Sequence, residues 1–384
     1  SVGGGEWNVA SGIFSTIAGG QANTAIGGTA AVGGGTINSA DGSSATVSGG
    51  YANKANGGYA AVGGGRHNEI TGAYGTIAGG GGINLADGNR VTNDYSTVGG
   101  GSRNTVSGNY ATISGGDDNT AGGSRAVVGG GNNNDAGGNY STVAGGYDHD
   151  ASGLYAMIPG GNGCTAHGSY SFAAGRHARA YNSGCFVWGD GSTNDDIECN
   201  NDDRWVARTR GGVYFDTNSG LTSGVLVPAG GNAWSSVSDR SLKENWQTVD
   251  NVALLERLVA QVPVTTWNYR SQDASVRHIG PMAQDLYAAF GLGEDAEHIS
   301  TVDADGVALA AIQGLHQIVS EQESQIAEQQ AQIVTLEARL AGLEEAVANP
   351  RQSTLRLPGG WLLLAGLVVT AGVAARGKSR GGGR

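Results

Sequence analysis

The sequence predicts a mainly β protein, in which a long parallel β-solenoid of 15-residue repeats precedes a small α+β domain, a coiled coil and a C-terminal transmembrane helix. Three observations lead to this fold class. Glycine supplies 70 of the 384 residues, against a usual share of about 7%, and is concentrated before residue 235. A short motif recurs at a fixed interval through that glycine-rich part. After residue 311 the apolar residues follow a heptad pattern instead. With 384 residues, the chain is long enough for two or three modules.

The repeat consists of a β-branched residue, any one residue, and then glycine. Every step is fifteen residues long, apart from one six-residue insertion. Such a short period with glycine at the turns is typical of a β-solenoid. We therefore expect stacked coils, in which alternate residues of short strands face inward. The repeated residues are Val2, Ile17, Val32, Val47, Val62, Ile77, Val98, Ile113, Val128, Val143 and Ile158.

An asparagine element keeps nearly the same interval. We expect these side chains to stack at one corner and to bond backbone groups of neighbouring coils. Each coil is too small to bury a core alone, so neighbouring coils and neighbouring chains must complete it. His149 and Cys164 stand in the asparagine position of the last coils. The asparagines are Asn8, Asn23, Asn38, Asn53, Asn68, Asn84, Asn104, Asn119 and Asn134.

Residues 1–189 resemble the heads of trimeric autotransporter adhesins of the YadA type, on blocks such as Tyr140–Gly146 and Asn8–Gly12. The resemblance implies a left-handed parallel β-roll that is trimeric and displayed at a bacterial surface. The period here is slightly longer than the usual period of that family. Adhesion to a host or surface ligand and a role as an inert spacer both remain open.

Residues 190–237 are predicted to form a β-rich connector, with strands at 205–208 and 212–215. Two acidic stretches, 190–196 and 200–203, raise the question of a calcium site. Because the spacing of an EF-hand loop is absent, we favour solvated loops and expect no bound metal.

The net charge is −12, the isoelectric point is near 4.9, and the first 230 residues contain no basic patch. Phosphate neutralisation supplies most of the affinity for nucleic acid, so the sequence argues against such a partner. The three cysteines Cys164, Cys185 and Cys199 have no metal-ligand spacing. One disulfide plus a free thiol, or three thiols, are both allowed. We expect no cofactor.

The stretch Ser238–Asn245 places a serine and a lysine five residues apart, where the glycine-rich part ends. A neutral Lys243 could take the proton of Ser238 as its hydroxyl attacks a carbonyl group. A structural alternative is a capping box, in which Ser241 and Glu244 satisfy amides at a helix start and Lys243 is merely solvated.

This stretch and the downstream stretch His278–Asp285 together resemble the endosialidase-type intramolecular chaperone family, the C-terminal autoprocessing domains of phage tail spikes and fibres. The resemblance covers about residues 234–347, with residues 238–311 as its core. It implies a domain that trimerises, directs the folding of an upstream β-rich fibre, and then cuts the chain on the amino side of the motif serine.

Carried over residue by residue, the family pattern makes Ser238 the nucleophile and Lys243 the base. The scissile bond would be Val237–Ser238. Asp239 and Asn245 would support the site, and His278 would be its neighbour. Some relatives keep the fold without cutting, so the uncleaved state remains an alternative.

Residues 312–348 are predicted to form a coiled coil of five heptads. Isoleucine at a positions and glutamine at two d positions favour a higher-order assembly. A trimer is expected because both resembled families are trimeric; a dimer is the alternative. The heptad residues are Ile312, Leu315, Val319, Gln322, Ile326, Gln329, Ile333, Leu336, Leu340, Leu343 and Val347.

The C-terminus is predicted to contain a linker at 349–360, a transmembrane or sorting segment at 361–375 and a basic cytoplasmic tail at 376–384. Extension of the apolar run to Leu357 makes it long enough to span a bilayer. The basic residues after it should stay in the cytoplasm, which places the upstream chain outside the cell.

Together these features predict an exported, trimeric surface fibre or adhesin that cleaves itself once, as a serine endopeptidase without an external substrate. The expected partners are two further copies of the chain, the membrane and an unknown surface ligand. The alternatives are an uncleaved, membrane-anchored adhesin and a prophage tail fibre.

Overall fold

The computed structural model describes residues 1–219 and 223–348. The chain divides into two compact units, and the division falls between Val237 and Ser238. The linker, the apolar segment and the basic tail expected at 349–360, 361–375 and 376–384 lie outside the described residues. Within the described ranges, no helix has the length and apolar character needed to cross a membrane.

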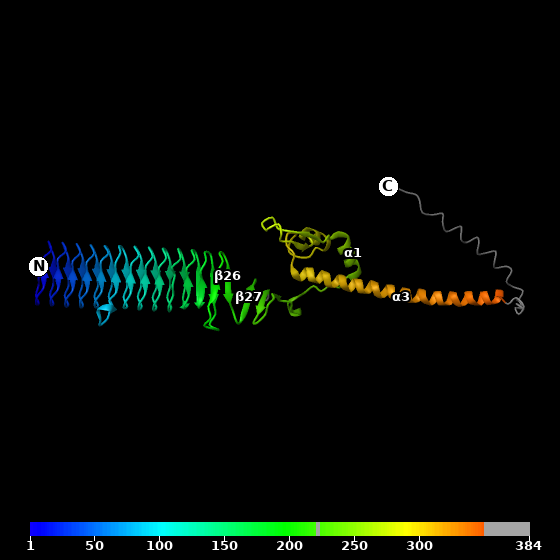
Figure 1. Cartoon of the computed structure of the whole chain (residues 1–384), viewed down its shortest axis with the longest axis horizontal. Helices are drawn as coiled ribbons and strands as arrows, with labels where there is room; N and C mark the ends of the chain where they lie inside the picture. Colours follow the sequence, from blue (N-terminus) through cyan, green and yellow to red (C-terminus); the bar gives the residue numbers. More distant parts are fainter. Residues whose placement is uncertain (220–222, 349–384) are drawn as a thin grey trace. The chain divides into compact units, whose positions relative to one another are not determined.

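The first unit is a parallel β-solenoid, as the sequence predicts (Figure 1). Its coils stack in register, so that Ile17 pairs with Val32 one repeat further on. The six-residue insertion does not break this register, because Ile77 pairs with Val98. The inserted residues instead carry a short 3-10 helix, η1 (Leu85–Asp87), outside the strands.

Each regular coil contributes one strand to each of two sheets. The first sheet has nine strands: β1 (Val9–Ala10), β3 (Thr24–Ala25), β5 (Ser39–Ala40), β7 (Lys54–Ala55), β9 (Glu69–Ile70), β11 (Arg90–Val91), β13 (Thr105–Val106), β15 (Thr120–Ala121) and β17 (Asp135–Ala136). The second sheet has fourteen strands: β2 (Thr16–Ile17), β4 (Ala31–Val32), β6 (Thr46–Val47), β8 (Ala61–Val62), β10 (Thr76–Ile77), β12 (Thr97–Val98), β14 (Thr112–Ile113), β16 (Val127–Val128), β18 (Thr142–Val143), β19 (Met157–Ile158), β22 (Phe172–Arg176), β24 (Phe186–Gly189) and β26 (Trp205–Arg208), with β20 (Gly161–Asn162) beside β22.

The core of the solenoid is a column of side chains that repeats along its axis. The β-branched repeat residues from Ile17 to Ile158 are at most 2% exposed, and alanines such as Ala55 and Ala121 fill the opposite wall. Small inward residues are needed because each coil is narrow. Glycine allows the turns: Gly50 has a φ of 98°, and a Cβ on it would lie 2.2 Å from the carbonyl oxygen of Gly65.

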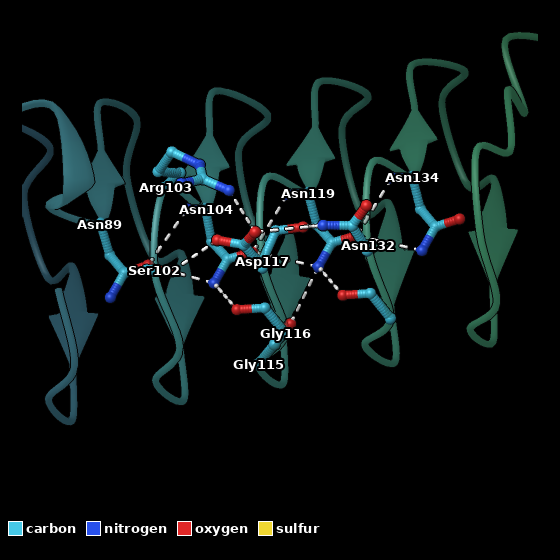
Figure 2. A network of polar contacts seen from close by, with 11 residues as sticks. Asn89, Ser102, Arg103, Asn104, Gly115, Gly116, Asp117, Asn119, Asn132 and Asn134 are labelled. Carbon is cyan, nitrogen blue, oxygen red and sulfur yellow. Dashed lines mark hydrogen bonds and ion pairs between the residues drawn. The ribbon is translucent and has the colours of Figure 1, made fainter. Parts of the chain in front are cut away.

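A ladder of buried asparagines runs along one corner (Figure 2). Asn104 is representative: its Nδ2 donates to the carbonyl oxygens of Gly100 and Gly116, each at 2.9 Å. Its Oδ1 accepts the backbone N–H of Asn119 at 3.1 Å. The side chain therefore joins successive coils and satisfies polar groups that the narrow interior would otherwise bury unpaired.

The prediction that Asn84 belongs to the ladder is wrong, because Asn89 occupies that position instead. The N–H of Asn89 donates to Oδ1 of Asn68 at 3.0 Å, and Oδ1 of Asn89 accepts from the N–H of Asn104. Asn84 lies at the start of η1, where its N–H donates to Asp87. The prediction failed because the six inserted residues lie before the asparagine of this coil. The ladder asparagine therefore comes six residues later than the fifteen-residue interval predicts.

The ladder changes composition in its last coils, as the sequence indicated. The N–H of His149 donates to Oδ1 of Asn134 at 3.3 Å, and the N–H of Cys164 donates to Nδ1 of His149 at 3.0 Å. Both side chains are buried. Burial lowers the pKa of His149, which keeps the imidazole neutral and able to accept this bond.

Exposed tyrosines form a second repeating column. Their ring centroids are 4.7–5.2 Å apart in two stacked runs. Arg125 occupies the position between the runs, with its guanidinium 5.2 Å from the ring of Tyr110 and 5.3 Å from that of Tyr140. The stack is thus continuous through a cation–π contact. Its tyrosines are Tyr59, Tyr74, Tyr95, Tyr110, Tyr140, Tyr155 and Tyr170.

Parallel pairing continues past residue 189 into β26, and a third sheet accompanies it. Cys185 and Cys199 form a disulfide while Cys164 is a buried free thiol, which decides between the two cysteine states left open. The unit then ends in an antiparallel sheet. The strands of the third sheet are β21 (Thr165–Ala166), β23 (Ala178–Ala180) and β25 (Ile197–Cys199), and those of the last are β27 (Gly212–Asp216), β28 (Gly224–Pro228) and β29 (Ser235–Ser236).

The acidic stretches are loops: residues 190–196 join β24 to β25, and residues 200–203 lie between β25 and β26. Asp190 accepts from Ser192, from Arg208 and from the N–H of Arg210, and these hydrogen bonds, Ser192 first, hold its pKa well below the usual range. The carboxylate is therefore already engaged by the protein. In the described part of the chain, no group of three or more histidines, cysteines and acids is arranged to hold a metal ion.

The second unit is α+β. A small core of Val262, Leu286 and Ala289 lies under the first two helices. Gly314 lets the long helix approach the first one closely, since a Cβ there would lie 2.3 Å from the carbonyl oxygen of Asn251. Its elements are η2 (Arg240–Leu242), α1 (Asn251–Gln261), β30 (Thr265–Trp267), β31 (His278–Gly280), α2 (Ala283–Phe290) and α3 (Thr301–Ala348).

Helix α3 is the long C-terminal helix that the heptads predict, and it begins eleven residues before the first heptad position, Ile312 (Figure 1). Its early residues Val307, Ala311 and Gly314 are buried within the unit. From Ile312 to Val347 the apolar heptad side chains are 41–79% exposed. A single chain therefore leaves this stripe without a partner.

Candidate self-cleavage site

Ser238 and Lys243 are in contact at the start of the second unit. Nζ of Lys243 donates a hydrogen bond to Oγ of Ser238 at 2.6 Å. This distance allows direct proton transfer between hydroxyl and amine. The structure thus brings together the two residues that the sequence singled out; their catalytic role remains a prediction.

A tight turn built on Asp239 makes this contact. Oδ1 of Asp239 accepts from both the N–H and the Oγ of Ser241, each at 2.7 Å. The N–H groups of Leu242 and Lys243 then donate to the carbonyl oxygens of Asp239 and Arg240 at 3.2 Å. Because η2 turns the chain back on itself, Lys243 returns beside Ser238.

The same turn keeps Asp239 ionised. The hydroxyl of Ser241, and then its backbone N–H, lower the pKa of the Asp239 carboxyl. A carboxylate that accepts two hydrogen bonds from one residue holds the turn in one conformation. Asp239 therefore acts on the geometry of the pair: in the described structure its carboxylate bonds Ser241, not Ser238 or Lys243.

The capping-box alternative does not form. Asp239, rather than Ser241, is the N-cap of the short η2 helix, and Glu244 lies outside any helix. The first α-helix of this unit starts later, at Asn251, where the side chain of Asp250 accepts from the N–H of Ala253. The motif matches the local pattern of a helix cap, but residues 240–242 form the η2 turn. They are therefore not available to begin an α-helix capped by Ser241.

Asn245 follows the pair in a left-handed backbone conformation. Its φ is 58°, in the left-handed region that asparagine tolerates better than most residues. One residue later, Trp246 lies under the guanidinium of Arg240, 5.4 Å from its ring centroid. The segment after Lys243 is thus folded back toward the turn, so that Trp246 contacts Arg240 of η2.

His278 makes its contacts within the small antiparallel sheet of the second unit. It lies on β31, where Nε2 is 2.9 Å from Oε1 of Gln272 and the ring packs against Trp267 and Tyr269. Its partner strand is β30, through Trp267. These interactions give His278 a packing role in the small antiparallel sheet, and none of them involves Ser238 or Lys243.

The other side of the candidate bond belongs to the first unit. Val237 follows β29, whose residues pair with β28, and the N–H of Val237 donates to the carbonyl oxygen of Gly224 at 3.4 Å. The acyl side of the bond is therefore held at the edge of a sheet. Val237 is the last residue of the first unit, and Ser238 is the first residue of the second.

Solvent reaches the whole site in a single chain, since every residue from 231 to 250 is exposed. A lysine acts as a base only when its amine is neutral, and loss of contact with water is what favours the neutral form. A single chain therefore has the hydrogen bond between the two side chains but not the desolvation that base catalysis by a lysine requires.

Comparison with known proteins supports the second unit's assignment. Residues 238–292 are similar to the family described as the chaperone of endosialidase, and that match begins at Ser238, the first residue of the second unit. No curated protein matches the chain. The intramolecular chaperone domain expected from the sequence is therefore supported, while the YadA-type resemblance of the solenoid stays a prediction.

Sequence reasoning missed Ser241 as part of the site. It treated this serine only as a helix cap, although Asp-x-Ser is a pattern in which the acid accepts from the amide and hydroxyl two residues on. The same pattern recurs at Asp273 and Ser275, where both hydrogen bonds form again. This local signal could have identified the turn.

Proposed function

We propose that the second unit is an intramolecular chaperone that assembles the chain as a trimer and then separates from the solenoid by cutting Val237–Ser238. Ser238 is the nucleophile and Lys243 the general base. The observation that carries this proposal is the 2.6 Å contact between Nζ and Oγ at the bond that divides the two units.

The exposed stripe of α3 supports the assembly step. Apolar side chains at heptad positions are stabilised when they pack between helices, and burial of each contributes roughly 1.5–3 kcal/mol. Gln322 and Gln329 at d positions would fix the register of the helices. Packing of copies would also remove water from Ser238 and Lys243, so assembly would precede cutting.

In this proposal the product is an exported trimeric fibre. A template that leaves after folding makes the fibre kinetically stable, because the route back through the template is lost. The solenoid would then serve as an adhesive or spacer element at a cell surface, with a ligand of unknown chemistry. An uncleaved adhesin is the second candidate, favoured by the solvent exposure of the pair.

The test compares the full chain with Ser238→Ala and Lys243→Met on a denaturing gel. General acid–base catalysis contributes roughly 10²–10⁴-fold, so either substitution should leave the chain at full length on the time scale of wild-type cutting. Ser236→Ala is the matched control, an exposed serine on β29 that should not slow cutting. The smaller wild-type fragment should begin at Ser238.

A single full-length band for the wild type, under conditions where the chain is trimeric, would contradict the self-cleavage proposal. It would favour the uncleaved adhesin. A fragment that begins at any residue other than Ser238 would move the site elsewhere.

A further inference from the structure

The proposed cut would take away the feature that assembles the fibre. The exposed heptad stripe lies on α3, so a cut between Val237 and Ser238 would remove it from the solenoid together with the second unit. A fibre that stays trimeric after the cut needs contacts between copies within residues 1–237. Such contacts require a face of the first unit that exposes apolar side chains and carries no charge, because the cores of interfaces are depleted of charged residues.

The second sheet of the solenoid has an uncharged outer column. In-register pairing places the first residue of one strand beside the first residue of the next along the sheet. These residues, all within the described ranges, point away from the buried core, and none of them is charged. The equivalent column of the first sheet includes Lys54, Glu69, Arg90 and Asp135. The uncharged column consists of Thr16, Ala31, Thr46, Ala61, Thr76, Thr97, Thr112, Val127, Thr142, Met157, Phe172, Phe186 and Trp205.

The last strands of this column carry aromatic rings in place of small side chains. Phe172 stacks on Phe186, with ring centroids 4.4 Å apart and an angle of 3° between the rings. Trp205 follows, 6.3 Å from Phe186. The run continues through Phe215 and Trp234, with centroid distances of 5.8 and 5.7 Å. Trp188, on the same face of β24 as Phe186, completes what we call the aromatic patch. Its residues are Phe172, Phe186, Trp188, Trp205, Phe215 and Trp234.

The aromatic patch is exposed in a single chain. Its rings from Phe186 to Trp234 are 40–60% exposed. An aromatic side chain carries roughly 150–250 Å² of surface, so each copy leaves on the order of 400–600 Å² of aromatic surface in water. Exposed apolar patches of this size mark interaction sites. A standard interface takes about 800 Å² from each partner, so the patch would supply much of this area and the uncharged column the remainder.

The partner that this surface fits best is the same face of another copy. Sites for small ligands place polar groups beside their apolar surfaces. Here the strand neighbours of Trp188 on its own face are Ala174 and Ala207, which have no polar side chain. Copies joined through α3 would also hold their patches at a high effective concentration.

We infer that the aromatic patch packs against the same patch of neighbouring copies, and that this contact keeps the solenoids together once the second unit has left. This inference rests on the proposed function, because it identifies what maintains the assembly after the cut. The patch alone supplies less area than a standard interface, which agrees with a contact that forms only after α3 has brought the copies together. A surface ligand, or another part of the same chain, are the alternative occupants.

Thiol reactivity tests the contact in the uncut chain. Ala207→Cys places a thiol on the outer face of β26, and it is combined with Ser238→Ala so that the chain stays whole. The native thiols do not compete, because Cys164 is buried and Cys185 is in the disulfide with Cys199. A maleimide should react more slowly with the assembled chain than with a chain that Ile326→Asp in the heptad stripe keeps monomeric.

The matched control for this measurement is Tyr147→Cys, at an exposed aromatic residue outside the uncharged column. Its thiol should react at the same rate in both states. Fast reaction of Ala207→Cys in both states would show that the patch stays open to a ligand in the assembly. Slow reaction in both would show that the patch is covered within one chain. Either result would overturn the inference.

Sedimentation after cutting tests whether the patch holds the solenoids together. The wild-type fragment 1–237 should stay oligomeric, whereas the same fragment of Trp205→Glu should dissociate to monomers, because a charge among the rings would lose its water. Both full chains should still assemble through α3 before the cut. An oligomeric Trp205→Glu fragment, or a monomeric wild-type fragment, would overturn the inference.

Tyr147→Glu is the matched control for sedimentation, and its fragment should stay oligomeric like the wild type. Retention of the β-sheet circular dichroism signal separates dissociation from unfolding. If Trp205→Glu does not fold, Ala207→Glu places a charge on the same face without removal of a ring, and it should dissociate the fragment in the same way.

These outcomes are distinct from failure of the proposed function. If the full chain never assembles, both the proposed function and the inferred contact are wrong. If it assembles but is never cut, the cleavage proposal is wrong, and thiol reactivity still decides whether the patches meet. If it is cut to begin at Ser238 while the patch stays open, the proposed function stands and only the inferred contact is wrong.

Discussion

At the scale of single residues, the asparagine ladder shows how this fold satisfies polar groups in a narrow interior. Each ladder asparagine forms hydrogen bonds with backbone groups in its own coil and in the next coil, so its loss has effects beyond one side chain. Asn104 donates to Gly100 and Gly116 and accepts from Asn119. Asn104 in the ladder can be compared directly with Asn84, the exposed asparagine of the insertion.

Replacement of Asn104 by alanine should lower the free energy of unfolding by about 1–3 kcal/mol for each buried polar group left unpaired. The measurement is chemical denaturation of the full chain, followed by β-sheet circular dichroism. Asn84→Ala is the matched control and should change stability little, because Asn84 is exposed at the start of η1. Equal losses from both variants would show that the ladder has no special role.

A second residue-scale prediction concerns acid. Burial lowers the folded-state pKa of His149, so protonation favours the unfolded chain, whose histidines titrate near about 6.5. The stabilisation that the neutral imidazole of His149 gives to the folded state is therefore complete above this unfolded-state pKa. It is lost as the pH falls below that value. His149→Asn should make thermal stability less dependent on pH between about 7 and 5.

The comparison uses the difference between the two pH curves, because other groups titrate in the same range in both proteins. Asp148 lies close enough to oppose part of the effect of burial. Parallel curves for wild type and variant would contradict a buried, neutral His149.

At the scale of elements, Gly314 determines how α3 packs on α1. Glycine usually weakens a helix by roughly 1 kcal/mol relative to alanine, so its presence in a 48-residue helix calls for a reason. Here the reason is a close approach, since the carbonyl oxygen of Asn251 lies 2.3 Å from the position that a Cβ would take. Gly342, in the same helix, has nothing within 4 Å of that position.

This contrast gives a prediction with opposite signs. Gly314→Ala should destabilise the second unit, because Cβ cannot fit without separation of α1 from α3. Gly342→Ala should stabilise α3 by up to about 1 kcal/mol through helix propensity alone. Thermal unfolding followed by the helical circular dichroism signal measures both. Stabilisation by both variants would show that the helices tolerate the added methyl group.

At the scale of the whole molecule, the exposed heptad stripe predicts that copies of the chain assemble through α3, and the resemblance to two trimeric families makes a trimer the expected state. Ile326→Asp places a charge in a layer expected to be buried between helices, and should convert trimers to monomers in sedimentation analysis. Ala331→Asp, at the f position on the opposite face of the same heptad, is the matched control. It should leave the oligomeric state unchanged.

A wild-type chain that sediments as a monomer at micromolar concentration would contradict the trimer. A dimer would instead support the alternative that the heptad pattern leaves open. In either case the assembly step proposed for the chaperone would need revision, whereas the fold of each unit would not.

The sequence by itself determined the solenoid, because a fifteen-residue period puts the same side chain in every coil and therefore specifies both the core and the stacking direction. It also determined the long C-terminal helix through its heptads, and the Ser238–Lys243 pair through spacing and resemblance. What it could not determine depends on contacts between residues whose separation follows no fixed period. The choice of Asn89, the pairing of Cys185 with Cys199 and the close approach at Gly314 are of this kind.

The turn at Asp239 marks the boundary between these two cases. Its residues were all visible in the sequence, and they were compatible with either a helix cap or a turn that returns Lys243 to Ser238. Both options use short-range hydrogen bonds of similar strength. Only the folded chain decided between them, because α1 starts at Asn251 and leaves the preceding residues free to form the turn.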